Sequence, residues 1–319
     1  MNKFKKIGLT ALAGSLVATS AFAGSLSVSG SASMDVNNVS GSADPSTGKN
    51  FSMGNSVIIS GGGELDNGMS VSVSFELDQG AGAGVSSATD TGKPFDSHSI
   101  TVSSDSLGSV TMAGEGASSA HSAIDTTAAG DIFDNGFGIA SPASSDAESG
   151  SLLYTLPSIM DDLTVTASYS AGKAAQESTT AFAVTYAGID GLSVSYGAGE
   201  MGSTTVASSG DVTTMKASYA YGSFTGAYSN TEVDYNTGGN DDEISSWKVS
   251  YTVTDDLSVS YGEETHETDG SSIDEEVDAI SASYTTGGMT VSLAQTEAAG
   301  IGHAASTGER WKLGLSFAF

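Results

Sequence analysis

The chain lacks cysteine, so no disulfide can stabilise it, and only four of its 319 residues are proline. Lysine and arginine number ten against 38 aspartates and glutamates, which gives a formal net charge of −28. Neutralising phosphates requires basic side chains, so nucleic acid is not an expected partner. No segment approaches the ~20 consecutive apolar residues of a membrane-spanning helix, which excludes a helical membrane protein. Without disulfides, an exported chain must be held by a large core or by extensive backbone pairing.

The N-terminal segment has the pattern of an export signal. Three lysines lie within the first six residues, an apolar run covers 7–18, and Ala-Phe-Ala stands at 21–23. A basic start, a short apolar run and small residues before a cleavage site are typical of a secretory signal peptide. We therefore predict a signal peptide over residues 1–23, cleaved after Ala23, and one exported domain over residues 24–319.

Apolar and small polar residues alternate along the rest of the chain. Residues 69–75, 163–169, 192–196 and 257–261 place apolar side chains at every second position, with Ser or Thr at every position between them. A period of two is typical of strands with one apolar and one polar face.

The connections between these segments alternate between short and long. Seven short ones, several with Asn-Gly, Asp-Gly or Gly-Gly, lie at 66–68, 105–108, 157–162, 188–191, 222, 254–256 and 287–288. Eight long ones lie at about 36–50, 79–94, 116–148, 171–177, 200–210, 233–242, 264–274 and 297–307. This pattern requires sixteen strands of ~9–12 residues, and it predicts an antiparallel transmembrane β-barrel with short periplasmic turns and longer extracellular loops.

In lipid the sheet must close, because no open edge survives there. The apolar face then contacts lipid, and the Ser/Thr face lines water. We expect an interfacial aromatic girdle near the turns from Tyr186, Tyr219, Tyr221, Tyr251 and Tyr284.

The last segment is amphipathic and stops on an aromatic residue. Its apolar side consists of Trp311, Leu313, Leu315, Phe317 and the final Phe319. Such a strand is similar to the assembly signal that the outer-membrane insertion machinery reads.

Together these features resemble the general diffusion porins, most closely the alphaproteobacterial, Rhodobacter-type branch. The resemblance rests on Ala-Phe-Ala at 21–23, the first strand at 24–35, the long third loop after Glu115 and the ending 313–319. It implies an outer-membrane homotrimer whose third loop folds into each pore. The implied function is passive diffusion of ions and small hydrophilic solutes, without enzymatic activity.

The third loop, predicted over 116–148, is the expected pore constriction. Its candidate pore-facing carboxylates are Glu115, Asp125, Asp131 and Asp134. Phe133 and Phe137 lie among these acids and are candidates to pack the loop against the barrel wall.

The strand parity also predicts which wall charges face the lumen. Basic side chains with inward parity are Lys216, Lys248, Arg310 and Lys312, and a lipid-facing charge near the midplane would cost about 2–4 kcal/mol. Glu76 and Asp78 share the inward face of the third strand. Basic residues facing an acidic loop would create a transverse field, and the acid excess predicts mild cation preference.

The histidines and acidic loops suggest no dedicated metal or cofactor site. His266 lies among several acids, but no second histidine stands at a ligand spacing, so we expect no metal there. We expect at most weak Ca²⁺ binding at acidic loops such as 241–243 and 274–276, where the ion would bridge the protein to lipopolysaccharide.

The alternatives are a substrate-specific porin, a structural or adhesive outer-membrane barrel, and a soluble exported β-protein. A sugar-specific porin usually has an aromatic track in its lumen, whereas the large aromatics here mostly share the lipid face. Most loops are short for an adhesin, and the terminal Phe319 with its polar partner face disfavours a soluble protein. A phospholipase-type barrel would need Ser and His outside, and His98 has no identifiable partner.

Overall fold

The computed structural model describes residues 24–41, 48–78, 95–124, 127–130, 137–147, 149–172, 177–202, 209–237 and 241–319. Within these ranges, no helix is long and apolar enough to cross a membrane. The signal-peptide prediction falls on residues 1–23 and lies outside the described residues.

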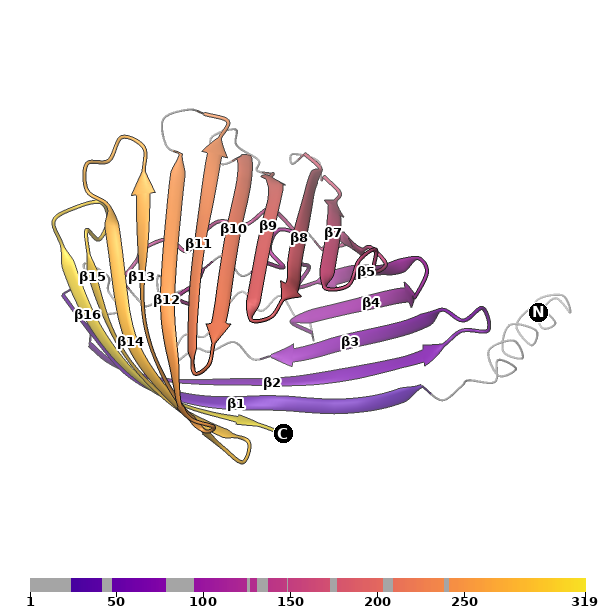
Figure 1. The fold of residues 1–319 in the computed structure, drawn as a ribbon, viewed down its shortest axis with the longest axis horizontal. Coiled ribbons are helices and arrows are strands. Elements are labelled where there is room, and N and C mark those ends of the chain that lie inside the picture. The colour runs from indigo at the N-terminus through magenta and orange to yellow at the C-terminus, as the bar shows by residue number, and fades with distance from the viewer. Residues whose placement is uncertain are drawn as a thin grey trace, which may run out of the picture.

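Sixteen antiparallel strands close into one barrel, as predicted, because β1 pairs with both β2 and β16 (Figure 1). The strands are β1 Ser25–Ser40, β2 Gly48–Glu64, β3 Ser70–Asp78, β4 Ser97–Ser104, β5 Gly108–Glu115, β6 Leu152–Thr155, β7 Leu163–Ser170, β8 Thr179–Ile189, β9 Leu192–Met201, β10 Gly210–Tyr221, β11 Phe224–Tyr235, β12 Asp242–Thr254, β13 Leu257–Thr268, β14 Glu275–Thr286, β15 Met289–Ala299 and β16 Thr307–Ala318.

The period-two pattern separates the two faces of the wall. On β10, Met215 and Tyr219 are exposed on the outside, whereas Val212 and Thr214 are buried inside. The predicted girdle tyrosines Tyr219, Tyr221, Tyr251 and Tyr284 are likewise exposed near the turns. The wall of the barrel is a single sheet whose apolar side faces outward. The apolar side chains of its strands therefore do not form a core between two packed sheets, as they would in a soluble β-sandwich.

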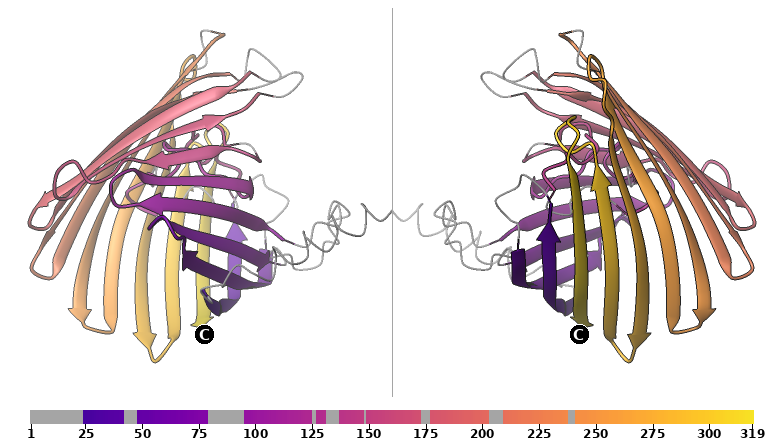
Figure 2. Two further views of the ribbon diagram at one scale, coloured as in Figure 1. Left: turned by 90° about the vertical axis from the view of Figure 1, so that its right-hand side faces the viewer. Right: turned by 90° about the vertical axis from the view of Figure 1, so that its left-hand side faces the viewer.

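All seven predicted tight turns are present, and glycine supplies the left-handed backbone at several of them. Gly191 and Gly288, for example, have φ angles of 75° and 87°. Several strands run further toward the long loops than the sequence suggested. β1 continues to Ser40, and its Asn37 and Val39 are buried on the lumen side. Strand lengths therefore range from 4 residues in β6 to 17 in β2, wider than predicted. Figure 2 shows the seam where the last strand, in yellow, lies beside the first, in indigo.

The third loop, residues 116–151, joins β5 to β6, and its described parts at 120–124, 127–130 and 137–145 contact the inside of the barrel wall. The buried apolar residues form two clusters where this loop meets the inner wall. One contains Phe137 and Ile139 of the loop with residues of β1, β12, β14, β15 and the last loop, and the other contains Ala120 and Ile124 with residues of β8. The barrel's core is therefore the contact between its wall and its own third loop.

Candidate functional site

The first part of the third loop is tied to the inner wall by hydrogen bonds. The backbone N–H of Ala120 donates to Ser168 Oγ of β7 at 2.9 Å. His121 Nε2 lies 2.9 Å from Thr214 Oγ1 of β10, and the N–H of Ser145 donates to His121 Nδ1 at 3.2 Å. These bonds hold the first part of the loop against the inner wall of the barrel.

The middle of the loop is held by one serine of the wall. The N–H groups of Ala128 and Ala129 both donate to Ser246 Oγ of β12, at 3.0 and 2.8 Å. Ser246 in turn donates to Glu264 Oε1 of β13 at 3.1 Å, and Glu264 is 0 % exposed. Because a hydroxyl has one proton to donate, this arrangement directs the serine's lone pairs at the loop.

The later part of the loop is seated by apolar contact. Phe137 is 1 % exposed and clusters with Ile244, Val277 and Ile301 among others. Burial of one aromatic side chain of this size is worth several kcal/mol, so Phe137 is the principal apolar anchor described in this loop.

Inward-facing glycines mark the track on which the loop lies. A Cβ at Gly197 would stand 2.8 Å from Ile124 Cδ1, and one at Gly308 would stand 2.6 Å from the Phe137 ring. A Cβ at Gly262 would reach 3.0 Å from the Ala129 side chain. The wall therefore has glycines, which lack side chains, at positions where the loop packs closely against it.

A closed sixteen-stranded barrel with a loop folded inward is the architecture of a transmembrane channel, and the comparison with known protein families agrees with it. A model of the Gram-negative porins matches residues 8–291. The chain belongs to the Gram-negative porin family. Family and fold make it an outer-membrane barrel of the diffusion-channel type.

Solved porin structures share this fold at low sequence identity. OmpF of Salmonella typhi in complex with daunomycin has a TM-score of 0.72 and 11% identity over 93% of this chain and 98% of that one. The anion-selective porin from Comamonas acidovorans has a TM-score of 0.67 and 14% identity over 93% and 100% of the two chains. A triple mutant of the Rh. blastica porin has a TM-score of 0.65 and 15% identity over 92% and 100%. A comparison with curated protein sequences finds no significant match.

Among the predicted constriction residues of this porin, Asp125, Asp131 and Asp134 lie outside the described residues, as does Phe133. Glu115 is described at the end of β5, where it pairs with His98 of β4. Their roles in the pore stay predictions.

Two predicted wall lysines lie against the third loop itself. Lys216 Nζ donates to Thr127 O at 2.8 Å, and a Cβ at Gly130 would stand 3.8 Å from Lys248 Nζ. The sequence pattern predicts that these lysines face the loop from the lumen side of the wall, and in the structure both lie close to it. Lys216 therefore helps to hold the loop, a role that sequence parity alone did not indicate, and Lys248 lies close to it.

The other predicted wall charges lie nearer the barrel seam and on β3. Lys312 Nζ of β16 is 3.4 Å from Asp35 Oδ2 of β1, so this ion pair spans the seam where β1 and β16 close the barrel. Arg310 lies on the same face of β16 as Lys312. Glu76 accepts hydrogen bonds from Ser56 and Ser97 on both neighbouring strands, at 2.9 and 3.0 Å. Asp78, two residues on, is exposed.

His121 makes the loop's attachment sensitive to pH. The Ser145 N–H donates to Nδ1, so the neutral ring carries its proton on Nε2 and donates to Thr214. Burial lowers the pKa of His121 from 6.5 to about 4. A released loop would regain the ordinary pKa and bind the proton more readily, so the seated state loses stability as the pH falls from 6.5 toward 4.

Acidification should therefore make the porin's current noisier or larger, because the first part of the loop comes free. The measurement is single-channel recording of the folded porin between pH 7 and pH 4. His121→Gln, which cannot take up the proton, should remove that step, while His98→Gln on β4 should leave it unchanged. An identical pH response in His121→Gln would contradict this role.

Proposed function

We propose that this porin is a water-filled channel for passive diffusion of ions and small hydrophilic solutes, without enzymatic activity. The supporting observation is a sixteen-stranded barrel with a hydroxyl-rich inner face, narrowed by its third loop. A barrel of this size leaves an aqueous channel unless it is filled. Liposomes containing the folded porin should swell in small sugars at rates that fall smoothly with solute size. Swelling with one sugar only would favour the substrate-specific alternative.

The channel is further proposed to prefer cations mildly. The inner wall carries three acids, Asp35, Glu76 and Asp78, and four bases, Lys216, Lys248, Arg310 and Lys312, of which Lys216 and Lys312 contact a loop carbonyl and Asp35. The predicted loop acids Glu115, Asp125, Asp131 and Asp134 bring the acids to seven. The formal charge of −28 adds to this balance. Fixed negative charge raises the local concentration of cations in enclosed water.

Neutralising two inward acids should weaken that preference. Glu76→Gln with Asp78→Asn is expected to shift the reversal potential in a KCl gradient toward zero. The matched control is Glu297→Gln with Glu309→Gln, which removes two exposed acids from the outer face of β15 and β16. Equal shifts in both double variants would mean that the lumen acids do not set selectivity.

We propose a homotrimer in which the outer face of β1–β5 contacts the neighbouring subunits. No Tyr or Trp precedes Tyr154 in the sequence, so these five strands have none of the Tyr or Trp of an interfacial girdle. Their outer face is nevertheless apolar, with exposed Leu26, Val28, Phe51 and Met53. Because Tyr and Trp mark contact with the membrane interface, their absence favours burial against protein. On a gel of unheated samples, the wild-type porin should migrate as a trimer. The double variant Leu26→Asp with Val28→Asp should migrate as a monomer if this arrangement is correct.

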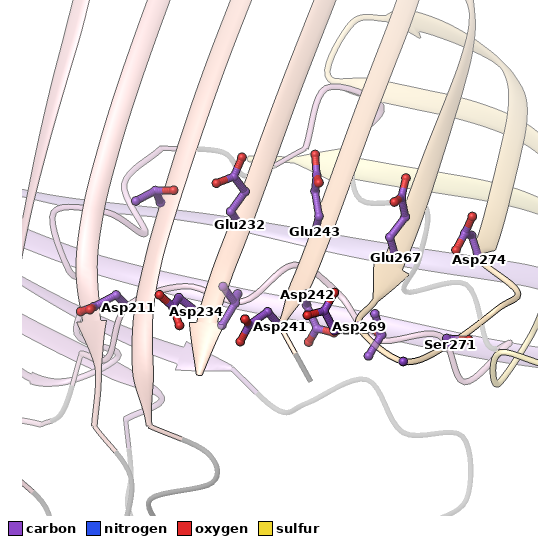
Figure 3. Close-up of a pocket in the computed structure, with 14 residues that line it drawn as sticks. Asp211, Glu232, Asp234, Asp241, Asp242, Glu243, Glu267, Asp269, Ser271 and Asp274 are labelled. Atoms are coloured by element: carbon purple, nitrogen blue, oxygen red, sulfur yellow. Dashed lines mark hydrogen bonds between the residues drawn. The ribbon is translucent and has the colours of Figure 1, made fainter. Parts of the chain in front are cut away.

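A belt of carboxylates on the outer face of β10–β16 is the proposed lipopolysaccharide contact. It consists of Asp211, Glu232, Glu243, Glu263, Glu267, Glu276, Glu297 and Glu309. It lies on the loop side of the apolar band: on β13, Glu263 and Glu267 follow Tyr261. Figure 3 shows part of it, with Glu232, Glu243 and Glu267 side by side on neighbouring strands. Like charges in direct cross-strand pairs are destabilising, so the belt favours bound Ca²⁺ or Mg²⁺ that can bridge to lipid phosphates.

Chelation should therefore lower the thermal stability of the isolated porin, and Ca²⁺ should restore it. Each like-charge pair costs roughly 0.2–1 kcal/mol, so several pairs together give a shift of a few degrees. The variant Glu232→Gln with Glu243→Gln should be less sensitive to the chelator. A melting temperature independent of chelator and of Ca²⁺ would contradict cation binding here.

Export and assembly complete the proposal. Residues 1–23 act as a cleaved signal peptide, and the strand ending at Phe319 is read by the insertion machinery of the outer membrane. N-terminal sequencing of the porin from outer membranes should begin at Gly24. The patterns at 21–23, 24–35 and 313–319 support the Rhodobacter-type branch, which an alignment of relatives would test.

A further inference from the structure

Three possible metal ligands from three segments meet at the loop end of the barrel. They are His266 near the end of β13, Glu275 at the start of β14 and His303 in the eighth loop, residues 300–306. One ligand atom of each lies within 4.8 Å of the other two. His266 Nδ1 is 2.8 Å and His303 Nε2 is 3.7 Å from the same oxygen, Glu275 Oε2.

The second polar atom of each ligand is held by another group. In metal sites, outer contacts of this kind orient the ligands and fix which ring nitrogen faces the metal. The three contacts are His266 Nε2 to Asp242 Oδ1 at 3.3 Å, the Gly302 N–H to Glu275 Oε1 at 2.7 Å, and His303 Nδ1 to the Ile273 carbonyl at 2.9 Å. All three candidate ligands are thus already oriented toward one another.

Burial and charge also favour a cation between them. His266 and Glu275 are 5 % and 3 % exposed, whereas His303 is partly accessible and leaves a route from solvent. The cluster combines the carboxylates of Glu275 and Asp242 with two imidazoles. With neutral imidazoles, the buried Glu275 and the partly buried Asp242 would together carry two negative charges, and a dication compensates them.

We propose that His266, Glu275 and His303 bind one divalent transition-metal ion of the Zn²⁺ class. Two imidazole nitrogens with one carboxylate oxygen form a common zinc donor set, with a fourth position for water. Ca²⁺ and Mg²⁺ prefer all-oxygen sets, so this site is chemically distinct from the acidic belt.

The spacings of the two histidine nitrogens from Glu275 Oε2 need little adjustment to accept such an ion. Metal–ligand bonds of about 2.0–2.2 Å place tetrahedral ligand atoms roughly 3.3–3.6 Å apart. The 3.7 Å contact of His303 with Glu275 fits, and the 2.8 Å contact of His266 with Glu275 opens by roughly half an ångström. The ion joins the eighth loop to β13 and β14, and Ile301 of that loop clusters with Phe137.

The test uses folded porin in detergent, stripped with a chelator and titrated with Zn²⁺ by calorimetry in excess Ca²⁺. Co²⁺ serves as a spectroscopic probe, because tetrahedral coordination gives it intense visible absorption, whereas octahedral Co²⁺ absorbs weakly. Glu275→Gln and His303→Gln are compared with matched controls: Glu276→Gln, whose exposed side chain lies on the opposite face of β14, and His98→Gln on β4.

We expect one Zn²⁺ per chain in wild type and in both controls, with Zn²⁺ raising the melting temperature. Each ligand variant should lose about 100-fold or more in affinity, and Asp242→Asn, an outer contact, roughly 10–100-fold. His303 lies in a loop, so the barrel should still fold when it is replaced by Gln. Loss of Zn²⁺ binding in a folded His303→Gln porin would then show that His303 is a ligand. Zn²⁺ binding that is absent in excess Ca²⁺, or equal in Glu275→Gln and Glu276→Gln, would overturn the site.

Discussion

Replacing Phe137 with alanine is expected to free the later part of the third loop and raise single-channel conductance. Phe137 is 1 % exposed, and its ring lies against Gly308 and the apolar cluster on β12, β14 and the eighth loop. Removing a buried phenylalanine side chain costs roughly 3–5 kcal/mol. The barrel keeps its backbone pairing, so this cost falls on the seated position of the loop.

The matched control is Phe182→Ala, which removes an exposed phenylalanine from the outer face of β8. Both variants should migrate as folded barrels before heating. Only Phe137→Ala should show larger, noisier conductance steps and faster liposome swelling with larger sugars. A folded Phe137→Ala porin with wild-type conductance would show that the loop stays seated without this anchor.

Replacing the terminal Phe319 with alanine is expected to reduce the amount of porin in the outer membrane severalfold, with little change in barrel stability. The Phe319 side chain is 73 % exposed, and the backbone bonds that close the seam do not need it. The Gly30 N–H donates to Phe319 O at 2.8 Å, and the Phe319 N–H donates to Gly30 O at 3.0 Å. If the Phe319→Ala porin is less abundant in the outer membrane but as stable as wild type after refolding, the side chain acts in recognition during assembly and not in barrel stability.

Phe224→Ala is the control, because Phe224 is 55 % exposed at the turn end of β11. Cell fractionation with heat-modifiability gels measures assembled porin, and thermal melts of refolded protein measure stability. Equal amounts of assembled Phe319→Ala and Phe224→Ala porin would contradict a role for Phe319 as an assembly signal.

The strand number and the two faces followed from the sequence because both depend on local chemistry. Alternation reports which side of a strand meets lipid, and turns such as 287–288 require glycine at positive φ. The long-loop boundaries were less accurate, since polar residues such as Asn37 continue the ladder when neighbouring strands extend beside them and they are buried.

The contacts of the third loop depend on positions that no local pattern reveals. Ser246 and Glu264 hold the loop through a barrel register that joins β12 to β13, and Ser246 looks like any other inward serine in the sequence. Gly262 and Gly308 did carry a usable signal, because glycine at an inward position of a strand indicates close approach of another segment.

The histidine cluster shows the same limit of sequence reasoning. His303 lies far along the chain from His266, so a search for ligand spacing found no partner. The pairing of β13 with β14, and the return of the eighth loop over Glu275, bring the two rings to a centroid distance of 5.2 Å.

Single-channel recording of the folded porin in a planar bilayer, with reversal potential in a KCl gradient, tests the proposed channel most directly. The expected result is stable ohmic steps that close in threes, with a reversal potential that favours K⁺. Insertion into the bilayer without conductance would contradict an open diffusion channel and indicate a plugged structural barrel. A reversal potential favouring Cl⁻ would keep the channel but contradict the proposed balance of lumen charge.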